Sequence, residues 1–190
     1  MFHSQYSNIQ LQTFVFANGD YITEVANAGD GHMNGVEAEV TAVPHPWLTL
    51  SAGVGYLDFK YDEVNDVVGP NTNTPPGKLL PFTPKWTANA SANAVLWEGA
   101  LGELSLRADY RYRSKTSYDI FNQGIEGEVG LLDGRLTLAG ADGSWSVFLL
   151  GRNLTDELYG PVGQFNLMGI AETRSYAPPR EWGAGVQYNF

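Results

Sequence analysis

The sequence contains no cysteine, few basic residues and no long run of apolar residues. Without cysteine, disulfides and thiolate metal sites are excluded. Lys and Arg total 11 against 21 Asp and Glu, and the resulting net charge of −10 argues against a nucleic-acid partner, whose phosphates need cations. No stretch approaches the roughly 18 consecutive apolar residues of a membrane-spanning helix. The N-terminus MFHSQYSNIQ lacks a basic region followed by an apolar core, so no signal peptide is expected there.

Charged residues are scarce, whereas glycine and the aromatic residues are abundant. Only 17% of the residues are charged, against roughly 25% in an average soluble domain. The chain has 22 Gly, 10 Tyr, 9 Phe and 5 Trp among 190 residues. This composition points away from an ordinary acidic soluble domain.

Apolar and polar residues alternate along much of the chain, which is the pattern of strands with one apolar and one polar face. From Trp86 to Leu96 the even positions are apolar, while the odd positions carry Thr, Asn and Ser and end at Val95. Alanine-rich composition favours a helix here by propensity. A helix would scatter the Asn and Ser residues around its circumference, so the period predicts a strand. Further strands are predicted at Ile9–Val15, Val36–Ala42, Leu48–Tyr56, Glu103–Arg113, residues 131–140, Trp145–Leu154 and Trp182–Phe190.

The links between these strands are of two kinds. Short turns are expected at Pro44–Pro46, Glu98–Gly102 and Ala141–Ser144, and long links at residues 62–85, 114–130 and 159–180. Alternating short and long links are typical of outer-membrane barrels, and many strands approach the 9–11 residues that cross a bilayer. Aromatic residues lie near the ends of the spans, as expected at membrane interfaces. We therefore predict an all-β fold with about eight antiparallel transmembrane β-barrel strands. A soluble sandwich or lipocalin can also alternate apolar and polar residues, but has less reason to sort its links so regularly.

The final residues, GAGVQYNF, resemble the C-terminal signal of outer-membrane barrels that the barrel assembly machinery reads. Phe190 is the last residue, with Tyr188 two and Gly185 five positions before it. Gly183 departs from this pattern, which has a polar residue there. The last strand exposes an edge until the barrel closes, so pairing with a partner there is physically reasonable.

Several longer stretches resemble the C-terminal barrel segment of TonB-dependent outer-membrane receptors, and together they span nearly all of residues 1–190. They are Asn27–Val40, Pro81–Leu96, Ala108–Asp119 and Gly151–Gly160 followed by the closing strand from Tyr176. The resemblance implies a parent protein in the outer membrane of a Gram-negative bacterium that imports siderophore-bound iron, haem, cobalamin or a similar nutrient. It implies as partners the membrane lipid, the assembly machinery, a plug domain and the TonB system, with no cofactor and no enzymatic activity.

The chain departs from that family in extent. We find no plug domain and no TonB-contact motif, and about eight strands rather than the 22 of such transporters. Met1 already lies within a strand-like pattern, which suggests an internal start. The resemblance therefore implies that the antiparallel transmembrane β-barrel segment of about eight strands is a partial wall of a larger barrel. We expect a fragment that cannot by itself perform gated transport. The alternatives are a small complete eight-stranded barrel with a structural or binding role, or a membrane-embedded hydrolase.

One charged row stands out among the predicted strands. Arg107, Asp109, Arg111 and Arg113 share a strand face, and Glu37 and Glu39 lie by parity on the polar face of theirs. Such a row either contacts an anionic ligand or the plug from the lumen, or is simply a hydrated wall.

The sequence contains no catalytic or metal-binding motif. His3, His32 and His45 are isolated in the sequence, so neither a metal site nor a catalytic residue is predicted from them. Serine-hydrolase, zinc-protease and phosphate-loop motifs are also missing.

Overall fold

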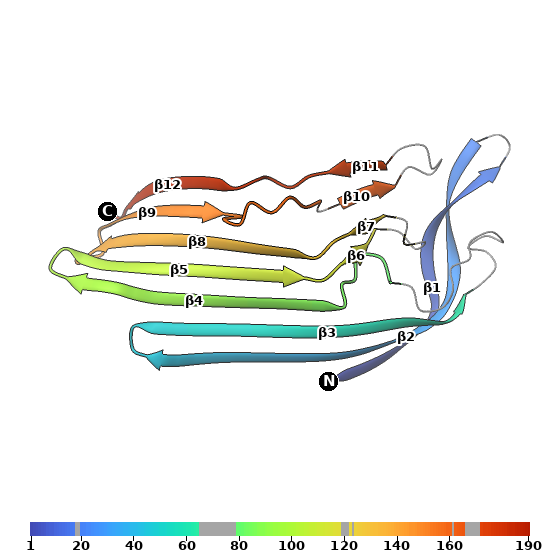
Figure 1. The fold of residues 1–190 in the computed structure, drawn as a ribbon, viewed down its shortest axis with the longest axis horizontal. Helices are drawn as coiled ribbons and strands as arrows, with labels where there is room; N and C mark the ends of the chain where they lie inside the picture. The colour runs from blue at the N-terminus through green and yellow to red at the C-terminus, as the bar shows by residue number, and fades with distance from the viewer. Residues whose placement is uncertain (18–19, 65–78, 119–121, 123, 161, 166–171) are drawn as a thin grey trace.

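The computed structural model describes residues 1–17, 20–64, 79–118, 122, 124–160, 162–165 and 172–190 (Figure 1). All of the regular structure in these ranges is β-strand, and they contain no helix long and apolar enough to cross a membrane. The all-β prediction is confirmed.

Eight long strands form one antiparallel sheet in the order β1-β2-β3-β4-β5-β8-β9-β12. Two short pairs, β6 with β7 and β10 with β11, lie in the links between β5 and β8 and between β9 and β12. The sheet is therefore a meander in which each long strand pairs with the next long strand in the chain. The bounds are β1 Phe2–Ala17, β2 Asp20–His45, β3 Leu48–Val64, β4 Trp86–Gly99, β5 Gly102–Arg113, β6 Thr116–Ser117, β7 Ile125–Glu126, β8 Val129–Gly140, β9 Trp145–Arg152, β10 Val162–Phe165, β11 Glu172–Ser175 and β12 Glu181–Tyr188.

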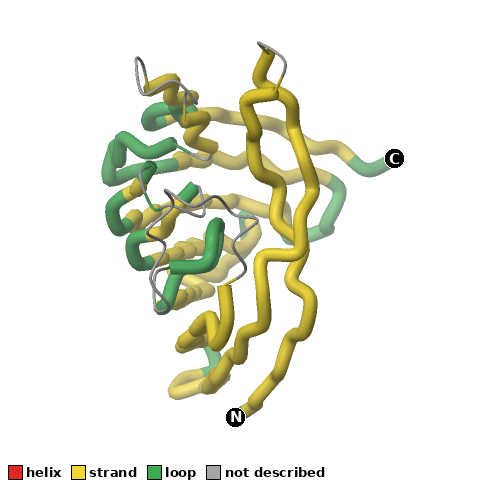
Figure 2. The backbone as a smooth tube through the Cα atoms, turned by 90° about the vertical axis from the view of Figure 1, so that its right-hand side faces the viewer, coloured by secondary structure: helices red, strands yellow, loops and turns green. Residues whose placement is uncertain are grey.

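The sheet is curved and open. In the described part of the chain, β1 and β12 are its two edges and do not pair with each other. Seen nearly along the strands, the backbone follows an arc rather than a closed ring (Figure 2). The predicted antiparallel segment of eight strands is confirmed.

Strand lengths differ from the sequence prediction mainly at the N-terminal side. β2 extends over 26 residues and β1 over 16, because their pairing continues well beyond the alternating core of each strand. The short turns of the β2–β3, β4–β5 and β8–β9 hairpins gather at one end of the sheet, with the C-terminus (Figure 1). The described parts of the long links, with the short strand pairs, lie at the other end, which we call the loop end.

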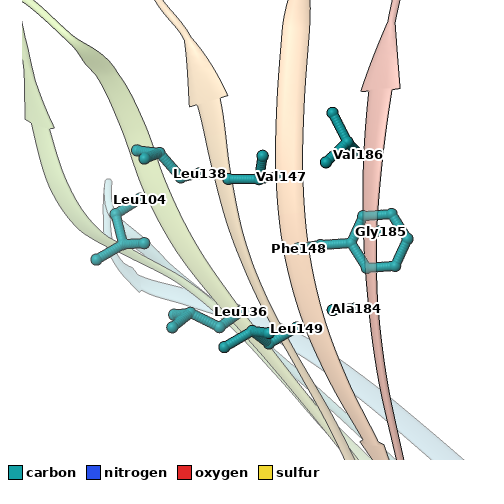
Figure 3. Close-up of a pocket in the computed structure, with 9 residues that line it drawn as sticks. All are labelled: Leu104, Leu136, Leu138, Val147, Phe148, Leu149, Ala184, Gly185 and Val186. Carbon is teal, nitrogen blue, oxygen red and sulfur yellow. The ribbon is translucent and has the colours of Figure 1, made fainter.

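Strand register gives the sheet two distinct faces. On one face, Ala38, Val54, Ala88 and Tyr112 are cross-strand partners in a single row from β2 to β5. This apolar face is open to the surroundings, since Val40 is 62% and Val186 is 76% exposed. A hollow of about 380 Å³ is lined by residues of β5, β8, β9 and β12, and Figure 3 shows how these residues lie.

Aromatic rings cover glycines on neighbouring strands, which connects the two unusual features of the composition. The Phe148 ring of β9 lies over Gly185 of β12, where a Cβ atom would strike it. On the other face the Trp182 ring lies over Gly151 in the same way. Leu150 packs on Gly183, on the same face of the sheet as Phe148 and Gly185. β9 is therefore apolar on both faces, because its side chains on this face cover glycines of the edge strand β12. Such rings replace the packing that glycine lacks.

Candidate functional site

The charged residues predicted from the sequence lie on the polar face of the sheet. Glu37 of β2 is in one row with Arg113 of β5, and Glu39 is in one row with Arg111. Two strands lie between the partners of each row, so they are about 14 Å apart at roughly 4.8 Å per strand. The structure thus brings the six residues to one face without a direct ion pair between the glutamates and the arginines.

Two of the arginines are neutralised within the sheet. Arg107 donates two hydrogen bonds to Asp109, of 2.7 Å from Nε and 2.6 Å from Nη2. Arg111 Nη2 donates to Asp133 of β8 at 2.6 Å. A bidentate or short charge-assisted pair of this kind holds the guanidinium in a fixed orientation. Arg107 and Arg111 therefore each have a carboxylate partner within the sheet.

Arg113, Glu37 and Glu39 differ from these two arginines. Within the described ranges none of the three forms an ion pair. Beside the glutamates is an open groove of about 390 Å³ whose floor includes Gly53 and Gly55 of β3. Its walls are polar because Glu37, Glu39, Thr87 and Asn89 line it. These charges are available to a group that approaches the polar face.

Asn153 ties three parts of the chain together directly after β9. It is buried at 6% exposure and has a positive φ of 49°. Its backbone N–H donates to Asp133 at 2.9 Å, and its side-chain amide donates to the carbonyl oxygens of Glu157 and Pro178. Its Oδ1 accepts the backbone N–H of Glu157 at 2.9 Å. Residues 153–157, which lie within the Gly151–Gly160 stretch of the sequence resemblance, are thus held by a network of hydrogen bonds centred on Asn153.

The hydrogen-bond network around Asn153 extends to the segment that leads into β12. Asp156 accepts the backbone N–H of Arg180 at 2.9 Å, and Leu154 N–H donates to Leu132 of β8 at 2.7 Å. Asp133 bonds both Arg111 and Asn153. The charged row and the start of the closing strand are therefore held by one continuous network.

A second buried cluster, at the loop end, was missed by the sequence analysis. The Tyr118 hydroxyl lies 2.7 Å from Glu126 and 2.6 Å from the Gly160 carbonyl oxygen, and donates to one of them at a time. Burial, and then the hydrogen bond to Glu126, raise the pKa of Tyr118, so its phenol stays protonated. Arg174 of β11 forms an ion pair with the buried Glu126. Two links far apart in the sequence, between β5 and β8 and between β9 and β12, meet here, and no local pattern signals that contact.

These observations describe a curved sheet with one apolar face and one charged face, and with hydrogen bonds and an ion pair between the links at one end. The family model described as TonB dependent receptor-like, beta-barrel matches residues 1–155 of the chain. The chain belongs to this family of TonB-dependent receptor barrels. The family predicted from the sequence is therefore confirmed.

Solved structures of uptake receptors and of a transporter share this fold over nearly the whole chain. The ferric yersiniabactin uptake receptor FyuA from Yersinia pestis matches with a TM-score of 0.77 and 21% identity, over 99% of this chain and 26% of that one. The siderophore receptor PiuA from Acinetobacter baumannii matches with a TM-score of 0.72 and 18% identity, over 98% and 25%. The copper transporter OprC matches with a TM-score of 0.67 and 14% identity, over 99% and 28%. The chain spans about a quarter of the length of these receptors.

Proposed function

We propose that the chain is a C-terminal part of the barrel wall of an outer-membrane TonB-dependent transporter that imports siderophore-bound iron or a nutrient of similar size. The observation that carries this proposal is the family match, together with the whole-chain likeness to siderophore receptors. The open edges of the sheet support a wall segment over a small complete barrel. A hydrolase is not favoured, since the charged row forms structural ion pairs and includes no nucleophile and base in contact.

In this proposal the two faces of the sheet have different surroundings. The apolar face meets the lipid of the outer membrane of a Gram-negative bacterium, and the polar face meets the lumen with its plug domain. TonB and the plug act in the complete transporter, of which residues 1–190 form one part. Transport rather than catalysis is the activity that this arrangement supports.

The edge strand β12 supports a role for the C-terminus in barrel assembly. One edge of β12 pairs with β9, and the described part of the chain provides no partner for the other. Tyr188 is the last residue of this strand and Phe190 lies two positions beyond it; their ring centroids are 5.1 Å apart, and both residues are exposed. We infer that Gly185, Tyr188 and Phe190 are read by the assembly machinery as a strand-pairing signal.

Arg113→Ala is expected to weaken uptake of an anionic cargo about tenfold, because loss of one charge-assisted hydrogen bond is worth about 1.4 kcal/mol. Arg113 is the arginine of the row nearest the loop end and has no ion-pair partner in the described ranges. The measurement is the concentration of ferric siderophore that gives half-maximal uptake into cells. Arg107→Ala is the matched control, since Asp109 already neutralises that side chain. Equal effects of the two substitutions would contradict a ligand role for Arg113.

The proposed function is tested by deleting the coding region of residues 1–190 in the source bacterium. We expect loss of radiolabelled iron uptake from one ferric siderophore or a small group of them, with recovery when the intact gene is returned. The same uptake should be absent in a strain without TonB. Copper belongs in the panel, because a copper transporter shares the fold. Unchanged uptake of every cargo, or a protein missing from the outer-membrane fraction, would overturn the proposal.

A further inference from the structure

We propose that His3 and His32 form a two-histidine site for a divalent transition-metal ion of the zinc, nickel or copper type. The two residues lie on the neighbouring strands β1 and β2, with ring centroids 6.2 Å apart. A metal ion bound about 2.1 Å from a ring nitrogen lies about 3.2 Å from the ring centroid, so two rings sharing one ion are about 5.2 Å apart at a tetrahedral angle and about 6.4 Å apart when the two nitrogens are opposite each other. The observed separation lies between these two values, nearer the second, and suits the wide ligand angles of nickel and copper sites more closely than tetrahedral zinc.

Hydrogen bonds set the protonation of both rings. His3 Nδ1 lies 2.8 Å from Asn34 Oδ1, and His32 Nδ1 lies 2.7 Å from Asp62 Oδ1. An amide oxygen and an ionised carboxylate only accept hydrogen bonds, so each Nδ1 carries the proton and donates it. In the neutral imidazole the lone pair is then on Nε2. In this tautomer both histidines present the same nitrogen, Nε2, to a metal ion.

This arrangement is the one that supports histidine ligands in metal sites. A histidine that binds a metal almost always donates its other ring N–H to a carboxylate or carbonyl oxygen, which fixes the tautomer and raises the basicity of the ligand nitrogen. His32 has a carboxylate in this position and His3 an amide oxygen. Neither partner is needed for the strand pairing itself, which uses backbone groups.

The site is accessible and lies beyond the apolar band. Paired residues of an antiparallel sheet share a face, and the pairing of His3 with Asn34 places both histidines on the continuation of the apolar face towards the loop end. The contact of the Tyr56 and Trp86 rings, 4.6 Å apart, marks the end of that band. The His32 side chain is 27% exposed. A metal ion in the surrounding water can reach it.

The surrounding charges suit a cation. Lys60 lies across from His32 in the strand register, but its ammonium group is 3.7 Å from Asp58, which also binds Lys85 at 2.6 Å. Asp62 has no lysine or arginine partner among the described residues, so its negative charge remains beside His32. No three His, Cys, Asp or Glu side chains converge on a metal position in the described ranges. The protein would supply two imidazole ligands, which zinc, nickel and copper all favour, and water would supply the others.

The test uses the intact protein purified from outer membranes in detergent, titrated calorimetrically with ZnCl₂ and NiCl₂. We expect one equivalent of metal to be lost, or its affinity to fall at least tenfold, in both His3→Ala and His32→Ala. Asp62→Asn should lower the affinity about tenfold while leaving both ligands in place. His45→Ala is the matched control, because His45 is at the opposite end of β2, where its ring contacts Trp47.

Copper provides a second readout that does not depend on affinity. With one equivalent of Cu²⁺, the electron paramagnetic resonance spectrum of the wild-type protein should show coupling to two imidazole nitrogens, and each single variant should show one fewer. Binding that is unchanged in both histidine variants would overturn the proposal. A loss in only one of them would equally overturn it, since it would indicate a single-histidine contact. Heat-modifiable migration on gels verifies that each variant is folded.

Discussion

Asn153→Ala is expected to lower the free energy of unfolding by about 3 kcal/mol, because a buried polar hub is removed and its partners are left unpaired. The side chain bonds the backbone of Glu157 in both directions and also reaches Pro178. Alanine at a φ of 49° adds a cost of about 1 kcal/mol that asparagine largely avoids. The measurement is denaturant unfolding in detergent micelles, followed by tryptophan fluorescence.

Two further variants separate the causes of that loss. Asn153→Gly tolerates the positive φ but lacks the side chain, so it should recover only the backbone part of the loss. Asn93→Ala is the control for an exposed asparagine, whose side chain makes one contact of 3.3 Å with Arg107. We expect that control to stay within about 0.5 kcal/mol of the wild type. If Asn153→Ala lowered the free energy of unfolding as little as Asn93→Ala, the hydrogen bonds of Asn153 would not stabilise the sheet.

Gly102→Ala is expected to cost about 3 kcal/mol or more, the range in which a substitution reflects a specific backbone conflict. Gly102 begins β5 with a φ of 144°, a conformation that residues with a side chain rarely adopt. A Cβ atom there would also strike the backbone carbonyl of Ala139 on β8. Because Gly102 pairs with both Gly99 and Gly140, two hairpins would have to shift. Unfolding in denaturant and gel migration with and without heating measure the effect.

Two other glycines provide matched controls for this substitution. Gly143 has a positive φ of 70° but nothing within 4 Å of an added Cβ, so Gly143→Ala reports the backbone cost alone. Gly127 has open space at the same position and no positive φ, so Gly127→Ala should be nearly neutral. The expected order of destabilisation is Gly102, Gly143 and then Gly127. Equal effects at Gly102 and Gly143 would show that the contact with Ala139 is relieved at little cost.

Local alternation was enough to predict which residues share a face. From Trp86 to Leu96 and from Glu103 to Arg113 the period of two identifies the apolar face, because successive side chains of any strand point to opposite sides. Alternation could not predict that β2 is 26 residues long, since the extra pairing with β1 involves mixed residues without a clear period.

The partners of individual residues were beyond the sequence. Arg111 and Asp133 are 22 positions apart, and Glu126 and Arg174 are 48 positions apart. The placement of a partner depends on the register of every intervening strand, and a shift of one residue moves a side chain to the opposite face. For the same reason His3 and His32 are isolated in the sequence and become neighbours only through the β1–β2 pairing.

By itself, the sequence determined the fold class, the two faces of the strands and the family, because each depends on local period or on short motifs within one stretch of chain. Only the tertiary structure decided that Arg107 and Arg111 form ion pairs within the sheet, while Arg113 forms none among the described residues. It also decided that Asn153 is buried at the centre of a hydrogen-bond network. It also decided that the abundant aromatic rings cover the abundant glycines. These contacts join different strands, and strand register, which no single stretch of sequence encodes, sets which atoms meet.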